Sequence, residues 1–251
     1  MSRTIKPEEY AAKRGEILDS AQRLLNAKGY QQMSIQDILN DLHISKGAFY
    51  HYFDSKAALL DALVERITQE VAGVLTPVVE DPNLPAIEKL QRYFHTASHW
   101  KTDRKALMLA LLAVWYADEN ALFRQKQTAA AFRQIAPAVA AILRQGVAEG
   151  VFSVSDPESA GEILLSLLAS LGDTAAQVLL AGDPRAATQQ RFARAAAAYN
   201  EALQRVLGAA RGALQIIDPE TLGEWVSALD EPASVQARQG PSSSSTDEPH
   251  N

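Results

Sequence analysis

Helix-favouring residues run through this chain almost without interruption, and this feature constrains its fold most. Ala, Leu, Gln, Glu and Arg dominate, whereas runs of β-branched residues with a period of two are missing. Proline and glycine divide the helical pattern into about nine or ten helices. The divisions fall at Pro77, Pro82 and Pro85, Gly146 and Gly150, Pro157, Gly182 and Pro184, and Pro219. The sequence therefore predicts an all-α fold.

The composition limits the possible functions. Of the 251 residues, 47% are hydrophobic and 22% are charged, which is typical of a soluble globular protein. Cysteine is absent, so disulfides and thiolate chemistry are excluded. The longest apolar run, residues 106–117, is shorter than the about 20 residues that cross a bilayer, and the N-terminus carries no secretory signal. We expect a cytoplasmic protein without membrane contact.

Charge is unevenly distributed along the chain. The net charge is −6. Residues 1–60 carry eight basic and seven acidic side chains, whereas residues 61–251 carry 16 basic and 23 acidic ones. Only the first segment can approach nucleic-acid phosphates without strong repulsion. This asymmetry is compatible with a DNA-binding head on an acidic body.

Three helices are expected at the N-terminus, followed by a longer one. Residues 8–28 carry apolar side chains at helical spacing and precede Gly29, a good residue for ending a helix. Ser34, with an acidic residue three positions later, begins the second helix with a capping-box pattern. After a short interruption, Ser45 is placed to cap a helix over residues 46–53.

The helix expected at residues 46–53 exposes unusual side chains. At about 100° per residue, Phe49 and Phe53 share the face toward the core. The other faces carry Gly47, Ala48 and His51, flanked by Tyr50 and Tyr52. Small residues let a helix approach a partner closely, an imidazole can contact a base edge, and tyrosine hydroxyls can reach phosphates. The pattern is typical of a helix that enters a DNA groove.

Three motifs follow one another within residues 14–66. They are Ser34-Ile35-Gln36-Asp37-Ile38, Ile44-Ser45-Lys46-Gly47-Ala48-Phe49-Tyr50-His51-Tyr52-Phe53 and Ser55-Lys56-Ala57-Ala58-Leu59. Together they resemble the DNA-binding segment of the tetracycline-repressor (TetR) family. The resemblance implies a helix-turn-helix domain that docks in the major groove. The alternative is a plain helical hairpin with two capped helices.

The resemblance also implies roles for individual residues. It places Ser34, Ser45, Lys46, Tyr50 and Lys56 on phosphates, and Gly47, Ala48 and His51 toward bases. Tyr52 joins the DNA-binding set because it flanks the same exposed face of the helix as Tyr50. The chain departs from the family at Leu39 and His43, where Ala and Gly are usual. A positive φ in this turn is uncommon for residues other than Gly, although His tolerates it better than most.

The larger segment carries no phosphate loop, nucleophile elbow or zinc-binding helix motif over residues 70–230. We therefore expect neither an enzyme nor a cofactor. Its aromatic and methionine residues gather on three consecutive helices: Tyr93, Phe94, Trp100, Met108, Trp115, Tyr116, Phe123 and Phe132. Core packing is the better explanation for most of them. The alternative is a pocket for a small apolar or cationic effector, and the family resemblance implies an inducer pocket here.

His95 and His99 lie one helical turn apart, which raises the possibility of a metal site. A helical wheel places both opposite the apolar stripe of their helix, and a third ligand is not evident beyond Asp103. A solvated polar face is therefore the preferred interpretation, and no metal is expected.

Two later helices are expected to form a homodimer. Residues 162–181 are rich in leucine and residues 185–210 in alanine, so two copies of the pair can build a four-helix bundle. The alternative is that both are internal helices of one domain. The resulting organisation is a DNA-binding domain at residues 1–60, a ligand-binding and dimerisation domain at 61–230, and a disordered tail at 231–251.

The sequence as a whole favours a ligand-responsive transcriptional repressor. It would bind a pseudo-palindromic DNA operator as a homodimer and be released by a small-molecule inducer. A related activator, or a regulator controlled by a protein partner, is the main alternative. An enzyme lacks an acid–base pair here, and a purely architectural DNA-binding protein would not need the large aromatic domain.

Overall fold

Helices make up most of the computed structural model, which describes residues 6–180, 184–218 and 225. Within these residues the elements are α1 (Pro7–Gln32), α2 (Ile35–Leu42), α3 (Lys46–Tyr50), α4 (Lys56–Glu80), α5 (Ala86–Asp103), α6 (Lys105–Trp115), the 3₁₀ turn η1 (Asp118–Asn120), α7 (Ala121–Ala148), α8 (Pro157–Leu180) and α9 (Arg185–Leu207). The predicted all-α fold is confirmed. The predicted disordered tail, residues 231–251, lies outside the described residues.

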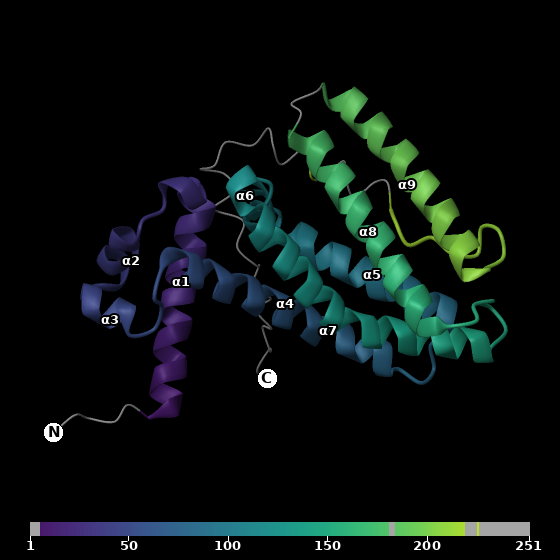
Figure 1. Cartoon of the computed structure of the whole chain (residues 1–251), viewed down its shortest axis with the longest axis horizontal. Helices are drawn as coiled ribbons and strands as arrows, with labels where there is room; N and C mark the ends of the chain where they lie inside the picture. Colours follow the sequence, from purple (N-terminus) through teal and green to yellow (C-terminus); the bar gives the residue numbers. More distant parts are fainter. Residues whose placement is uncertain (1–5, 181–183, 219–224, 226–251) are drawn as a thin grey trace, which may run out of the picture.

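The first three helices and the start of α4 form an N-terminal head with its own core (Figure 1). Phe49 and Phe53, which were predicted to face inward, are 0% and 3% exposed. They pack in this core with Ile17, Ile38 and other apolar residues of α1, α2 and α4. Each aliphatic or aromatic side chain buried in this way stabilises the fold by about 1.5–3 kcal/mol relative to an exposed one.

Local signals define where the head helices begin and end. Ser34 and Ser45 cap α2 and α3 as predicted, each accepting a hydrogen bond from the amide three residues later. Gly29 adopts a φ of 74° inside α1, where the sequence predicts the helix to end. His43 adopts a φ of 52°, and the Ile44 amide donates to the Leu39 carbonyl at 3.1 Å. The turn therefore keeps the left-handed geometry that a glycine would supply.

Two expectations about helix ends are wrong. The third helix ends at Tyr50 rather than at residue 53, although the amides of Tyr52 and Phe53 still donate to the Phe49 carbonyl at 2.9 and 3.1 Å. This turn keeps Phe53 in the core. Pro77 does not interrupt α4, which continues to Glu80. A proline removes the hydrogen bond to the residue four positions earlier and disturbs the preceding turn, so the helix can continue past it.

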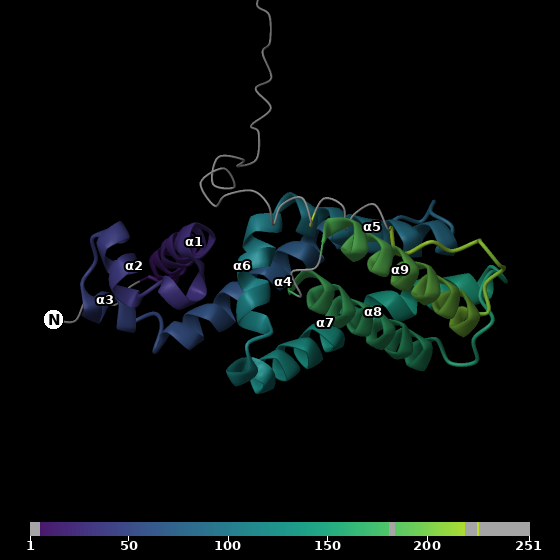
Figure 2. The same ribbon diagram turned by 90° about the horizontal axis from the view of Figure 1, so that it is seen from above.

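The other helices form the body, in which α8 and α9 lie side by side as an outer pair (Figures 1 and 2). The core of the body joins α4, α5, α7, α8 and α9. The predicted domain boundary after residue 60 falls inside α4, whose first turns belong to the head core and whose later part packs on α5. Helix α6 packs against α1 and places Leu107 in the head core.

Two sets of contacts hold the outer pair, α8 and α9, on the body. In the turn before α8, the ring of Phe152 lies so close to Gly146 that a Cβ there would clash with it. After α9, the C-terminal segment (residues 208–218 with Trp225) returns along the body. Asn200 holds it by accepting from the amides of Ile216 and Ile217, both at 3.1 Å, and by donating to the Ile217 carbonyl at 2.9 Å.

Candidate nucleic-acid interface and effector site

The outer surface of α3 carries most of the residues that the sequence predicts to contact DNA. Ser45, Lys46, Gly47 and His51 are exposed, and Tyr50 is 41% exposed. Ala48 and Tyr52 are half-buried. The Lys46 ammonium lies 5.9 Å from the Tyr50 ring centroid, so a cation and a phenol hydroxyl occupy neighbouring positions on the helix. This arrangement supplies groups for both phosphates and base edges.

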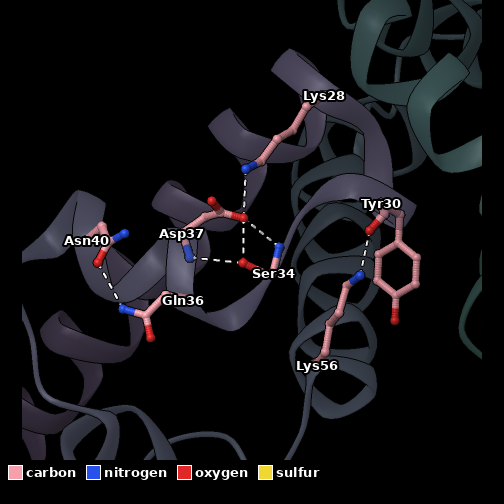
Figure 3. Close-up of polar contacts among 7 residues, drawn as sticks. All are labelled: Lys28, Tyr30, Ser34, Gln36, Asp37, Asn40 and Lys56. Carbon is pink, nitrogen blue, oxygen red and sulfur yellow. Dashed lines mark hydrogen bonds and ion pairs between the residues drawn. The ribbon is translucent and has the colours of Figure 1, made fainter.

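Ser34, predicted to bind a phosphate, lies at the exposed N-terminus of α2 in a closed capping box (Figure 3). Its backbone amide and hydroxyl donate to the Asp37 carboxylate at 2.7 and 2.6 Å. Its hydroxyl oxygen in turn accepts from the Asp37 amide at 3.2 Å. The sequence pattern predicted this box because both partners are local in the chain.

Lys28 binds the same carboxylate, at 2.6 Å from Asp37, and fixes the end of α1 to α2. This bond and the bonds from Ser34 hold the pKa of Asp37 well below its ordinary value. Sequence reasoning missed Lys28 because no local motif links it to the capping box. The ion pair neutralises a carboxylate that would otherwise repel a phosphate at this helix end.

Lys56, also predicted to bind a phosphate, is half-buried and already bonded (Figure 3). Its ammonium donates to the Tyr30 carbonyl at 2.5 Å and lies 4.0 Å from the Tyr30 ring centroid. Burial lowers the pKa of Lys56. The side chain therefore joins the first residue of α4 to the turn at the end of α1.

The residues predicted to line an effector pocket do not come together in one place. Tyr93 and Trp100 are only 4% and 7% exposed, and burial raises the pKa of Tyr93 to about 12. Phe94 and Phe132 are partly buried against the body core. Met108 packs against the head core instead, because α6 lies against α1. The structure therefore separates Met108 from a pocket in the body.

Three of the predicted pocket residues lie at the turn between α6 and α7. The Trp115 and Phe123 rings meet edge to face with their centroids 5.8 Å apart. The Tyr116 hydroxyl donates to Asp173 of α8 at 2.6 Å. Burial and this hydrogen bond raise the pKa of Tyr116. Phe123 and Phe132 are about two and a half turns apart on α7, so they face opposite sides of the helix.

The solvated face predicted around His95 is wrong, whereas His99 is exposed as expected. Gln91 and Thr102 share one face of α5 with His95. Both bond to the C-terminal segment, at 3.4 and 3.2 Å. Between them, the Nε2 atom of His95 is buried without a hydrogen-bond partner among the described residues. No group of three or more metal-binding side chains is found within the same residues.

The capping box predicts a pH-dependent contribution to stability. Because the folded-state pKa of Asp37 is depressed, its contribution is present above the ordinary value of about 3.9 and is lost as the pH falls through the folded value. Asp37→Asn should therefore lower the free energy of unfolding in urea at pH 7, and the gap to wild type should narrow below about pH 4. Asp54→Asn, at an exposed aspartate, is the control. A difference in the free energy of unfolding between Asp37→Asn and the wild type that stays constant with pH would contradict this account.

Two family models match the chain. The model described as "Bacterial regulatory proteins, tetR family" matches residues 17–63, from within α1 to the start of α4. The model described as "Tetracyclin repressor-like, C-terminal domain" matches residues 114–175, which include η1, α7 and most of α8. The head and the body therefore match models of the same family.

Named relatives match over part of their length. The HTH-type transcriptional repressor DhaR of Mycobacterium sp. is 26% identical over 81 residues, which cover 32% of this chain and 41% of DhaR. The HTH-type transcriptional regulator EthR of Mycolicibacterium smegmatis is 28% identical over 140 residues, which cover 49% of this chain and 64% of EthR. The chain thus spans less than two thirds of either relative.

Solved structures share the fold over most of the chain. A TetR-family transcriptional regulator from Pectobacterium atrosepticum has a TM-score of 0.62 at 20% identity, covering 82% of this chain and 100% of that one. A TetR transcription regulator from Haloarcula marismortui has a TM-score of 0.59 at 20% identity, covering 79% and 97%. With head and body models of one family and the shared architecture, the chain belongs to the tetR family of bacterial regulatory proteins.

Proposed function

We propose that this protein is a transcriptional repressor that binds operator DNA through α3 and is released by a small molecule bound in the body. The observation that carries the proposal is the two-sided character of α3. Phe49 anchors it in the head core, whereas Lys46, Gly47, Tyr50 and His51 are exposed. An α-helix of this kind fits the major groove, with side chains on base edges and on phosphates.

The proposed contacts divide into two kinds. Gly47, Ala48 and His51 contact bases, and Ser34, Ser45, Lys46, Tyr50, Tyr52 and Lys56 contact phosphates. Ser34 and Lys56 are already held by Asp37 and by the Tyr30 carbonyl. Groups fixed before binding lose less conformational freedom when the phosphate arrives. The repressor named DhaR, which matches part of this chain, supports repression over activation.

The DNA proposal predicts different effects for a base contact and a phosphate contact. His51→Ala should weaken binding to a duplex that the wild type selects from a random pool by about 1–3 kcal/mol, with unrelated DNA nearly unaffected. Lys46→Ala should weaken binding to both duplexes and reduce the salt dependence. Fluorescence anisotropy at several salt concentrations measures both effects.

Equal loss on both duplexes for His51→Ala would remove this residue from base reading. In cells, the protein should lower the expression of a reporter gene that has the selected duplex upstream of it. A rise in expression would instead make the protein an activator.

We place the homodimer interface on α8 and α9, and the protein in the cytoplasm. Among the described residues α8 alone is long and apolar enough to cross a membrane, with a mean hydropathy of 1.7 over its most apolar 18 residues. It packs against α7 and α9, yet Ile163 and Leu180 are 50% and 53% exposed. Large apolar side chains exposed on a helix embedded in a helical domain are typical of a subunit interface. Leu171, at 7%, belongs to the core of the subunit instead.

The dimer proposal predicts that a charge at the exposed Ile163 of α8 separates the subunits. Ile163→Arg should give a monomer, because an arginine would be buried in the interface without a partner. Leu122→Arg, at a leucine of α7 that is 63% exposed, should leave the dimer intact. Sedimentation velocity at micromolar concentration measures the assembly state. A monomeric wild type would refute the interface.

We place the effector beside the partly buried rings of Phe94 and Phe132, which line the body core from α5 and α7. The Tyr93 and Phe94 rings meet edge to face with centroids 5.2 Å apart, so a phenol lies next to this apolar surface. Apolar walls with a few polar groups are the usual lining of a small-molecule site. A dimer with two matched heads would lose its operator when the ligand favours another spacing.

The effector site predicts a difference between two phenylalanines of α7. Phe132→Ala should reduce the response to uncharged aromatic compounds that raise the melting temperature of the wild type. Phe123→Ala removes an equal ring from the opposite side of the helix and should keep the response. The response of each variant is measured by melting curves with and without compound and by the release of the selected duplex. Equal losses in the two variants would contradict this site.

A further inference from the structure

Three aromatic rings meet where the start of α1 reaches the end of α3. The Tyr10 ring centroid lies 4.7 Å from that of Tyr52 and 5.7 Å from that of His51. The His51 and Tyr52 centroids are 5.0 Å apart, with the rings edge to face. In Figure 1 the N-terminal end of α1 extends beyond α3. Tyr10 lies outside the segment that matches the family model, residues 17–63.

His51 needs support from outside its own helix. It is the C-cap residue that directly follows α3, and its side chain is exposed. An exposed side chain at such a position samples several rotamers, and fixing one of them on binding costs conformational entropy. The edge-to-face contact with Tyr10, at an interplanar angle of 78°, restricts the imidazole before DNA arrives.

Tyr10 is half-buried and packs on the rings of His51 and Tyr52. Charges of both signs flank it in α1, with Glu8 and Glu9 before it and Lys13 and Arg14 after it. These charges give Tyr10 no clear preference for a phosphate of its own. We therefore assign Tyr10 an indirect effect on DNA, through the ring of His51.

We propose that Tyr10 is a positioning residue of the DNA interface, which orients His51 for base contact. The proposal rests on the proposed function of α3. It adds the first turns of α1 to the part of the head that determines base contact. Sequence preference then depends on a residue that does not touch DNA.

The test measures binding of Tyr10→Ala, Tyr10→Phe, His51→Ala and the Tyr10→Ala/His51→Ala double variant to the duplex selected by the wild type from a random pool. Tyr10→Ala should lose about five- to tenfold in affinity for the selected duplex and little for unrelated DNA. Tyr10→Phe keeps the ring and should match the wild type. The double variant should bind no more weakly than His51→Ala alone, because both changes remove the same contact.

Several outcomes would overturn the proposal. Wild-type affinity in Tyr10→Ala would do so, as would additive losses in the double variant. Equal loss on selected and unrelated DNA would show a merely structural role, and Tyr10→Leu, which keeps apolar packing without the aromatic edge, repeats the test if Tyr10→Ala unfolds. A wild type that selects no sequence from the pool would refute the proposed function as well.

Discussion

The structure depends on one helix, α4, that belongs to two hydrophobic cores. Leu59 and Leu63 pack in the head, whereas Leu75 packs in the body. Between them, Arg66 holds α1 through Asp19 and Gln22, at 2.6 and 2.5 Å. Because a helix of this length is stiff over a few turns, the body sets the direction of the head. The contact of α6 with α1 fixes the same orientation from a second side.

The head combines a negative charge with a surface proposed to bind a polyanion. Asp37 is needed to close the capping box of α2, yet its carboxylate lies where a phosphate would approach Ser34. The ion pair with Lys28 at 2.6 Å resolves the conflict by cancelling that charge. A half-buried lysine, Lys56, has a lowered pKa because of desolvation. A phosphate at this position would favour its charged form and offset that desolvation.

Local features of this fold could be predicted from the sequence, and contacts between distant segments could not. The cap at Ser34, the interruption of α1 at Gly29 and the inward position of Phe49 each depend on neighbouring residues. The surroundings of Met108 and His95 depend on such distant contacts. Met108 is placed by the packing of α6 on the head. His95 lies on the face of α5 to which the C-terminal segment bonds. A helical wheel describes one helix alone, so it cannot show which other segments pack against it.

The charge of the effector can be argued from the aromatic faces that the protein itself occupies. The Arg104 guanidinium lies 4.2 Å from the Trp100 ring centroid, and that of Arg124 lies 5.0 Å from that of Tyr116. A cationic ligand would compete with these groups for the rings that bind cations best. The acidic balance of residues 61–251, 23 acidic against 16 basic side chains, attracts a cation only weakly, because salt screens exposed charges beyond about 8 Å. Phe94 and Phe132 offer apolar surface instead, so the site that we propose favours an uncharged, flat molecule.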